Sequence, residues 1–241
     1  MRDRRARRGR NRLALTLAKS TPTRAVLFDV DGTLIDSNDL HAEAWAEAMA
    51  RFGQHVPVPV IRGQIGKGSD NLIPALLPAD WAEKYGDELD QARGELFKTD
   101  YLARIRPFPK IRELFERLKS DGKTIVLASS GSRTEVDHHI ETLGVGDLLD
   151  GSTSKDEAEH SKPDPDIFAA ALAKTGFGAS EATVVGDTPY DVEAAGKIGL
   201  RTIAVRAGGF DEDALRQAGA VELWDDVADL LANYDRSLLS R

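Results

Sequence analysis

Helical and strand patterns alternate along the chain after Pro107-Phe108-Pro109, and few folds are compatible with that order. Apolar residues at helical spacing follow Lys110 and end at Gly122, and the apolar run at residues 124–128 is typical of a buried strand. The alternation continues to the end of the chain, with strands expected at residues 183–185, 201–205 and 221–223. Strands that alternate with helices pair in parallel through right-handed crossovers. The sequence therefore predicts a doubly wound parallel α/β sheet with helices on both faces.

An earlier strand precedes a segment with only helical patterns. Residues 25–30 form a short β-branched and aromatic run that ends in Asp-Gly, which predicts the first strand. From Ser37, expected to cap the first helix, helical patterns cover residues 37–52, 58–65, 69–77 and 79–101. We therefore predict a core domain of residues 22–36 and 108–241, and a helical cap domain of residues 37–107 inserted after the first strand, called the helical insert below.

Charge is distributed unevenly along the chain. Residues 1–12 hold seven arginines and one aspartate, a net of +6, so the other residues carry −14 to give the overall −8. The apolar stretch that follows the arginines is shorter than a secretory signal needs. Residues 1–21 are therefore expected to be a disordered basic leader, and we do not expect nucleic acid as a partner.

The chain has no cysteine, which excludes disulfides and thiolate metal sites and is compatible with a reducing compartment. No apolar run approaches the roughly 18 residues that span a bilayer. We expect a cytoplasmic protein with no membrane partner, and the sequence leaves its oligomeric state open.

Polar residues follow the predicted strands, where ligands bind in sheets of this kind. Asp29 and Asp31 end the first strand, and their side chains should lean the same way in extended backbone. Two buried carboxylates repel unless a cation joins them or one takes a proton. Asp187 and Asp191 follow another strand, and hard oxygen ligands favour Mg²⁺. For Asp191, which lies at a helix start, capping alone is an alternative.

Three further residues could hold an anion. Ser129 and Ser130 lie where a helix should begin after a strand, so their hydroxyls and backbone N–H groups could bind phosphate. Lys162 precedes Pro163 and adds a cation. Each residue alone is ordinary, but their order, each near a strand end, points to phosphoryl chemistry.

In these motifs the chain resembles the haloacid dehalogenase superfamily, and the resemblance extends from Arg24 to about Tyr234. The first motif, DxDGT, is found in FDVDGTLIDS, and the second is Ser129 after IVLA. The third is Lys162 in SKPDPDIF, and the fourth is Gly186-Asp187 with Asp191.

The resemblance implies a role for each motif residue. Asp29 would be the nucleophile that forms an aspartyl-phosphate, and Asp31 would act first as general acid and then as base. Asp29, the backbone carbonyl of Asp31 and Asp187 would hold Mg²⁺, and Asp191 would either support these ligands from behind or act as an outer ligand. Lys162, with Ser129 and the neighbouring Ser130, would bind the phosphoryl group.

The helical insert resembles the small cap of the phosphoglycolate phosphatase and β-phosphoglucomutase branch. Such caps close over the site and select the substrate. The candidate contacts are His41, Trp45, Arg62 and Lys67. His41 and Trp45, four residues apart, could instead pack against the core, whereas Lys67 between two glycines is placed for a mobile contact.

Three functions follow from these features. The first is a Mg²⁺-dependent phosphatase of a small phosphorylated metabolite, such as phosphoglycolate or a sugar phosphate, which Thr33 and Gly186-Asp187 favour. The second is a β-phosphoglucomutase-like mutase, favoured by His41 and Trp45. The third is a non-catalytic binding module that uses the basic leader, against which Asp29, Lys162 and their partners argue.

Overall fold

The computed structural model describes residues 21–241, so the leader prediction lies almost entirely outside the described residues. Six parallel strands form one sheet in the order β5-β4-β1-β6-β7-β8, with β1 near its centre. Their bounds are Ala25–Phe28 (β1), Thr124–Ala128 (β4), Gly151–Thr153 (β5), Ala182–Gly186 (β6), Arg201–Val205 (β7) and Glu222–Trp224 (β8). The chain first builds outward from β1 through β4 to β5 and then returns to the other side of β1 with β6. The predicted doubly wound fold is confirmed.

Both faces of the sheet are covered by helices, because successive side chains of each strand point to opposite faces. In β1, Val26 and Phe28 belong to one apolar cluster, whereas Ala25 and Leu27 both pack in a second cluster. The first cluster includes residues of α5 (Ile111–Ser120) and α10 (Val227–Ala232), and the second includes residues of α7 (Asp166–Thr175) and α8 (Pro189–Lys197). These two layers hold the carboxyl ends of β1, β4 and β6 at one edge of the core.

Two further helices complete the core, α6 (Arg133–Leu143) and α9 (Glu212–Ala218). Helix α6 begins with a capping box, in which the Ser132 backbone N–H donates to Glu135 at 2.7 Å. Strand β5 was not predicted, because its three residues, Gly-Ser-Thr, form no apolar run. Among residues 21–241 no helix is long and apolar enough to cross a membrane.

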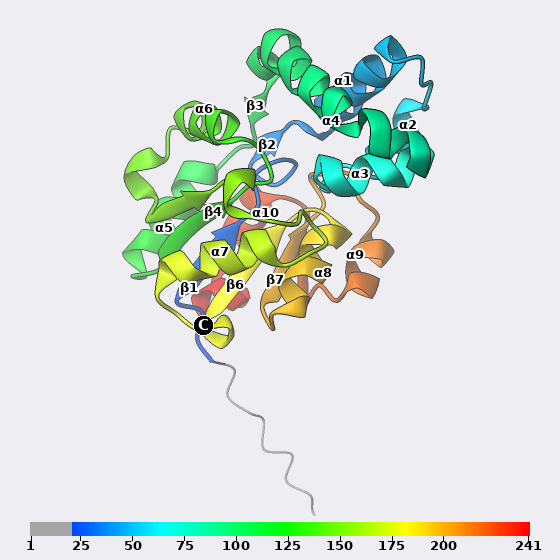
Figure 1. Cartoon of the computed structure of the whole chain (residues 1–241). Coiled ribbons are helices and arrows are strands. Elements are labelled where there is room, and N and C mark those ends of the chain that lie inside the picture. Colours follow the sequence, from blue (N-terminus) through cyan, green and yellow to red (C-terminus); the bar gives the residue numbers. More distant parts are fainter. Residues whose placement is uncertain (1–20) are drawn as a thin grey trace, which may run out of the picture.

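The helical insert lies over one end of the core (Figure 1). Its helices are α1 (Asn38–Arg51), α2 (Val58–Arg62), α3 (Ser69–Leu76) and α4 (Ala79–Leu96), and α4 continues as a π-helical segment to Tyr101. The two connections to the core pair with each other as antiparallel strands, β2 (Ile35–Asp36) and β3 (Arg106–Pro107). The domain boundaries given above stay a prediction.

Ser37 does not cap α1 through its side chain, contrary to the sequence-based expectation. Its hydroxyl instead donates to Oδ1 of Asp31 at 2.6 Å. Donation to this charged acceptor holds the hydroxyl at the preceding loop, and its oxygen accepts no backbone N–H of α1.

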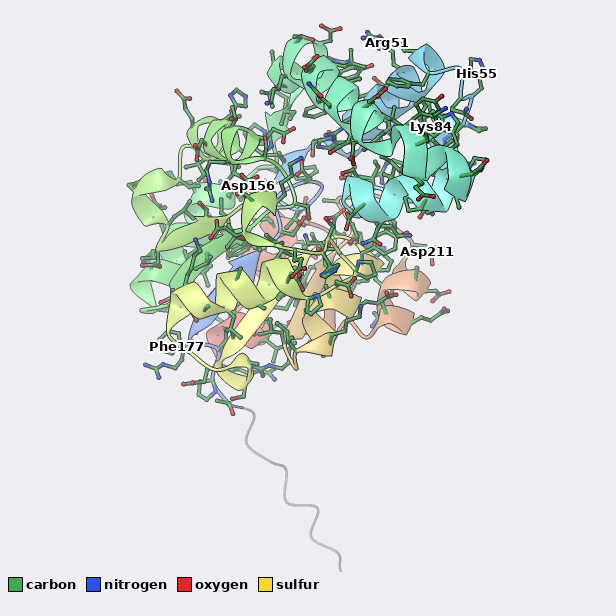
Figure 2. The ribbon with its side chains drawn as sticks, in the orientation of Figure 1. Arg51, His55, Lys84, Asp156, Phe177 and Asp211 are labelled. Atoms are coloured by element: carbon green, nitrogen blue, oxygen red, sulfur yellow. The ribbon has the colours of Figure 1, made fainter. Side chains whose placement is uncertain are left out.

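The C-terminus lies beside the start of β1, at the end of the core away from the helical insert (Figure 1). The Thr23 backbone N–H donates to the carbonyl of Arg241 at 2.8 Å. Figure 2 shows the polar side chains that cover the insert and the core, including Lys84 on the insert and Asp211 at the start of α9. Both chain ends that the structure describes are therefore remote from the edge where β1 and β6 end.

Candidate active site

The carboxyl ends of three neighbouring strands bring the predicted residues together. Asp29 follows β1, Ser129 follows β4, and Asp187 follows β6, and all three side chains are buried. Parallel strands end at the same edge of a sheet, so this convergence follows from the strand order.

Lys162 reaches the same point from the loop before α7 and is almost fully buried. Its Nζ donates to Oδ1 of Asp29 at 2.5 Å and lies 2.7 Å from Oδ1 of Asp191. The other oxygen of Asp191 accepts from the backbone N–H and the hydroxyl of Thr188 in the capping box of α8. Asp191 therefore takes part in the capping box of α8, in which Thr188 is the N-cap residue, and also holds Lys162, so capping is not its sole contact.

The side chain of Asp187 is held by hydrogen bonds and by the close approach of the Gly32 backbone. Nδ2 of Asn38 donates to its Oδ2 at 2.8 Å. The hydroxyl oxygen of Thr33 lies 3.1 Å from Oδ1 of Asp187 and 3.1 Å from Oδ2 of Asp29, so its single proton can serve one of the two carboxylates at a time. A Cβ at Gly32, where φ is +79°, would lie 2.3 Å from Oδ2 of Asp187, and only glycine fits there.

The buried carboxylates exceed the buried cations. Oxygens of Asp29, Asp187 and Asp191 lie within 4.8 Å of one another, and Lys162 is the cation that contacts two of them. Burial raises the pKa of Asp29 to about 7, against the opposing charge of Lys162. Burial, reinforced by the charge of Asp29, also raises the pKa of Asp187 well above its ordinary value. Such a set of hard oxygen donors can hold a divalent cation, which would relieve the repulsion.

Asp31 faces the helical insert. Its Oδ1 accepts from Oγ of Ser37 at 2.6 Å and pairs with Nε2 of His41 at 2.9 Å. Nη2 of Arg93 binds Nδ1 of the same imidazole, and a guanidinium can only donate, so Nε2 carries the proton that His41 gives to Asp31. Burial alone would raise the pKa of Asp31, but the contacts from His41 and Ser37 hold that pKa well below its usual range.

Asp29 and Asp31, together with His41 and Arg93 of the insert, line a cavity of about 100 Å³ between the core and the helical insert. Of the residues predicted to bind phosphate, Ser130 and Lys162 line it. Ser129 lies beneath this surface, and its Oγ accepts from the Gly131 backbone N–H at 3.0 Å. The Ser129 hydroxyl proton therefore remains available to an anion.

Three of the four insert residues proposed as contacts also line the cavity: His41, Trp45 and Lys67. Nζ of Lys67 donates to Oε1 of Gln64 at 2.6 Å, and it lies 4.7 Å from the ring centroid of Tyr190. Arg62 is not among the cavity-lining residues. It instead binds the side chain of Asp39 and the carbonyl of Gly208, so it links the insert to a core loop.

Sequence reasoning missed several polar residues of the site, among them Asn38, Arg93, Glu135 and His139. Asn38 follows Ser37 at the start of α1, and its proximity to the DxDGT loop could have indicated it. Arg93 belongs to α4, and its Nη1 lies 3.9 Å from Oε1 of Glu135 on α6. That contact depends on the position of the insert relative to the core, and the sequence pattern does not predict this position.

Residues 26–205 match the family model described as haloacid dehalogenase-like hydrolase, which is most of the chain. The chain therefore belongs to this family, as its motifs indicated. It is 27% identical over 215 residues to a phosphoglycolate phosphatase of Rhodospirillum rubrum, a match that covers 86% of this chain and 89% of that protein. The match to the family and to proteins named phosphatases defines the class of enzyme as a phosphoric monoester hydrolase.

Two other similarities differ in kind. The protein SUPPRESSOR OF QUENCHING 1, chloroplastic, of Arabidopsis thaliana is 32% identical over 215 residues, which are 87% of this chain and 20% of that protein. This chain thus spans about a fifth of that relative. The solved structure of a putative β-phosphoglucomutase from Bacteroides vulgatus superposes with a TM-score of 0.82 at 26% identity and covers 92% of this chain and 93% of that one.

Proposed function

We propose that the protein is a Mg²⁺-dependent phosphatase of a small phosphorylated metabolite and that it acts through an aspartyl-phosphate on Asp29. The observation that carries the proposal is the buried group of Asp29, Lys162 and Asp187 at the ends of β1 and β6. Such a group is costly to bury without a ligand. A divalent cation would supply the positive charge that the group lacks, and together with Lys162 it could hold an anionic phosphoryl group.

The residues that would hold the cation are Asp29, Asp187 and the backbone carbonyl of Asp31. When bound, Mg²⁺ would neutralise the carboxylates and the phosphoryl oxygens, which favours attack of one anion on another. Asn38 and Thr33 orient Asp187 and Asp29 through the hydrogen bonds described above. Asp191 acts behind this layer by holding Lys162.

The chemical steps use Asp29 and Asp31. A carboxylate oxygen of Asp29 attacks phosphorus while the P–O bond to the leaving group breaks, and protonated Asp31 donates its proton to the departing oxygen. Asp31, now ionised, then takes a proton from water, whose oxygen attacks the same phosphorus and frees Asp29 and inorganic phosphate. Lys162 and Ser129 bind the phosphoryl oxygens throughout.

The hydrogen bonds to Asp31 favour the second of these steps. His41 and Ser37 both donate to Oδ1 of Asp31, so the observed arrangement suits a carboxylate that accepts the proton of water. To protonate the leaving group, Asp31 must already carry a proton before the P–O bond breaks. The helical insert, which carries His41 and Arg93, would therefore influence the proton on Asp31.

A phosphosugar mutase is the alternative, since a putative β-phosphoglucomutase shares the fold of this chain, including the insert. A mutase would return the phosphoryl group to the sugar, whereas a phosphatase passes it to water. Incubation with a hexose 1-phosphate and Mg²⁺, followed by assay of inorganic phosphate and hexose 6-phosphate, distinguishes the two. Release of phosphate is expected, and formation of the 6-phosphate without release would contradict the proposal.

The direct test is a panel of phosphorylated metabolites, including 2-phosphoglycolate and sugar phosphates, assayed with Mg²⁺ and with chelator. The Asp29→Asn variant is the control, because it removes the proposed nucleophile. We expect hydrolysis that depends on both Mg²⁺ and Asp29. Equal phosphate release by this variant would refute the mechanism, and it would leave the binding-module alternative open.

A further inference from the structure

Two residues that line the cavity each hold a buried side-chain nitrogen with no hydrogen-bond partner among residues 21–241: Nε of Arg93 and Nδ1 of His139. Arg93 lies on α4 of the helical insert, and His139 lies on α6 of the core. His139 is 1% exposed. Buried polar groups are nearly always paired, so two such atoms on residues that line one cavity point to a partner from outside the chain.

The chemistry of the two atoms restricts that partner. The guanidinium of Arg93 can only donate, so its partner must accept. Burial lowers the pKa of His139, which favours the neutral ring with one donor and one acceptor nitrogen. A hydroxyl group can accept from Arg93 and donate to an unprotonated Nδ1 of His139, whereas a carboxylate could use only a protonated Nδ1.

The charges of the wall also disfavour a second anionic group on the substrate. Apart from Asp29 and Lys162, the lining residues carry three carboxylates and three cations. The carboxylates are Asp31, Asp90 and Glu135, and the cations are Lys67, Arg93 and Lys155. Arg93 already pairs with Glu135 at 3.9 Å and Lys155 with Asp90 at 3.6 Å. Lys67 is the cation that remains for an anion, which makes a carboxylate substrate the competing possibility.

We propose that His139 and Arg93 form a subsite that binds a neutral hydroxyl of the leaving group, so that the substrate is a polyol or sugar phosphate. The inference rests on the proposed phosphatase function and narrows its substrate class. His139 is a residue that determines specificity in this scheme, because it contacts the leaving group and not the phosphorus. It lies outside the four motifs by which the chain was assigned to its family.

The test compares two substrates of equal chain length, glycerol 1-phosphate and propyl phosphate, which differ only in their hydroxyl groups. We expect kcat/KM of the wild-type protein with Mg²⁺ to favour glycerol 1-phosphate by about tenfold, the effect of one hydrogen bond of ordinary strength. The His139→Ala variant should lose most of this preference. Asn places an amide near the position of Nδ1, so His139→Asn should recover part of it.

The adjacent His138 supplies the matched control. It lies on the same helix but outside the cavity wall, and its ring pairs weakly with Thr142 at 3.4 Å. His138→Ala should keep the wild-type preference and activity. Circular dichroism and thermal unfolding of each variant would show whether a general loss of activity comes from a loss of folding.

Three results would overturn the subsite. The wild-type protein could show equal kcat/KM for the two substrates, as expected if water is the hydrogen-bond partner of both nitrogen atoms. A folded His139→Ala or His139→Asn protein could lose activity on both substrates equally. The wild-type protein could prefer 2-phosphoglycolate, which would assign the cavity to a carboxylate held by Lys67. If it hydrolyses none of these substrates, nor 4-nitrophenyl phosphate, the proposed phosphatase function itself fails.

Discussion

Removal of divalent metal should make the protein less stable as the pH rises, because Asp29 is a buried carboxyl group whose pKa is raised. Its pKa increases from 3.8 to about 7 on folding, mainly through burial. The folded state therefore binds this proton more tightly than the unfolded state, and stability is lost as the pH rises from about 4 through about 7. At 1.36 kcal/mol per pKa unit, the full effect is roughly 4 kcal/mol, of which roughly 3 kcal/mol falls between pH 5 and pH 8.

The assay is thermal unfolding at pH 5 and pH 8, with chelator and with millimolar Mg²⁺. For a chain of this size a loss of about 3 kcal/mol lowers Tm by about 6 to 12 °C. Mg²⁺ should restore most of this loss at pH 8 and little at pH 5, because the cation binds the ionised carboxylates. Asp187 should act in the same direction, since its pKa is also raised.

Two variants separate Asp29 from the general repulsion in an acidic protein. Asp29→Asn should flatten the dependence of Tm on pH in chelator and weaken the response to Mg²⁺. Asp100→Asn changes an exposed carboxylate and should follow the wild-type protein. A metal-free wild-type protein as stable at pH 8 as at pH 5, or a Mg²⁺ response of equal size at both pH values, would refute the argument.

Asp29→Asn should lower kcat by at least about 10³-fold while the far-UV circular dichroism stays unchanged, because an amide is a poor nucleophile; steady turnover by this variant would contradict its role. Lys162→Met should destabilise the protein by about 3–5 kcal/mol in urea unfolding without metal, since Asp29 and Asp191 lose their buried cation, and an unchanged unfolding midpoint would show that the ion pairs contribute nothing. Asp31→Asn should slow hydrolysis of alkyl phosphates far more than that of 4-nitrophenyl phosphate, whose leaving group departs without an acid, and equal losses would leave the acid role unsupported. Lys67→Ala should change the order of preference among natural phosphates, and a uniform loss on every substrate would place Lys67 in the phosphoryl machinery or the fold.

The core of the site could be predicted from the sequence because strand ends determine it. Asp29, Ser129 and Asp187 each follow an apolar run directly, and parallel pairing places those ends at one edge. Lys162 was identified from Pro163 beside it, from its order among the other site residues and from its motif, but its contact with Asp29, 133 residues away in sequence, was not foreseen. For Asp191 the sequence offered helix capping as an alternative, and the residue does join the capping box of α8, but its contact with Lys162 was not foreseen.

What the sequence did not reveal depends on packing between the insert and the core. His139 and Glu135 lie on the side of α6 that faces the cavity, but the polar spacing of that helix does not distinguish this side from the solvent side. Ser37 has the usual features of a helix cap, yet its hydroxyl donates to the nearby carboxylate of Asp31 and accepts no backbone N–H of the helix. Both the cavity-facing side of α6 and the hydrogen bond of Ser37 depend on distances between elements, and the periodicity of the sequence does not predict those distances.

The contacts between the insert and the core connect the position of the insert to Lys162, the lysine proposed to bind phosphate. Nδ2 of Asn71 on α3 donates to the carbonyl of Ser161 at 2.9 Å and lies 3.3 Å from that of Lys162. A Cβ at Gly68 would lie 2.0 Å from Oγ of Ser161, so the glycine permits this approach. Movement of the insert away from the core would break these bonds as well as the link from Arg93 through His41 to Asp31. A single displacement would therefore alter both the loop that presents Lys162 and the groups that bind the proton of Asp31, which couples entry of the substrate to assembly of the site.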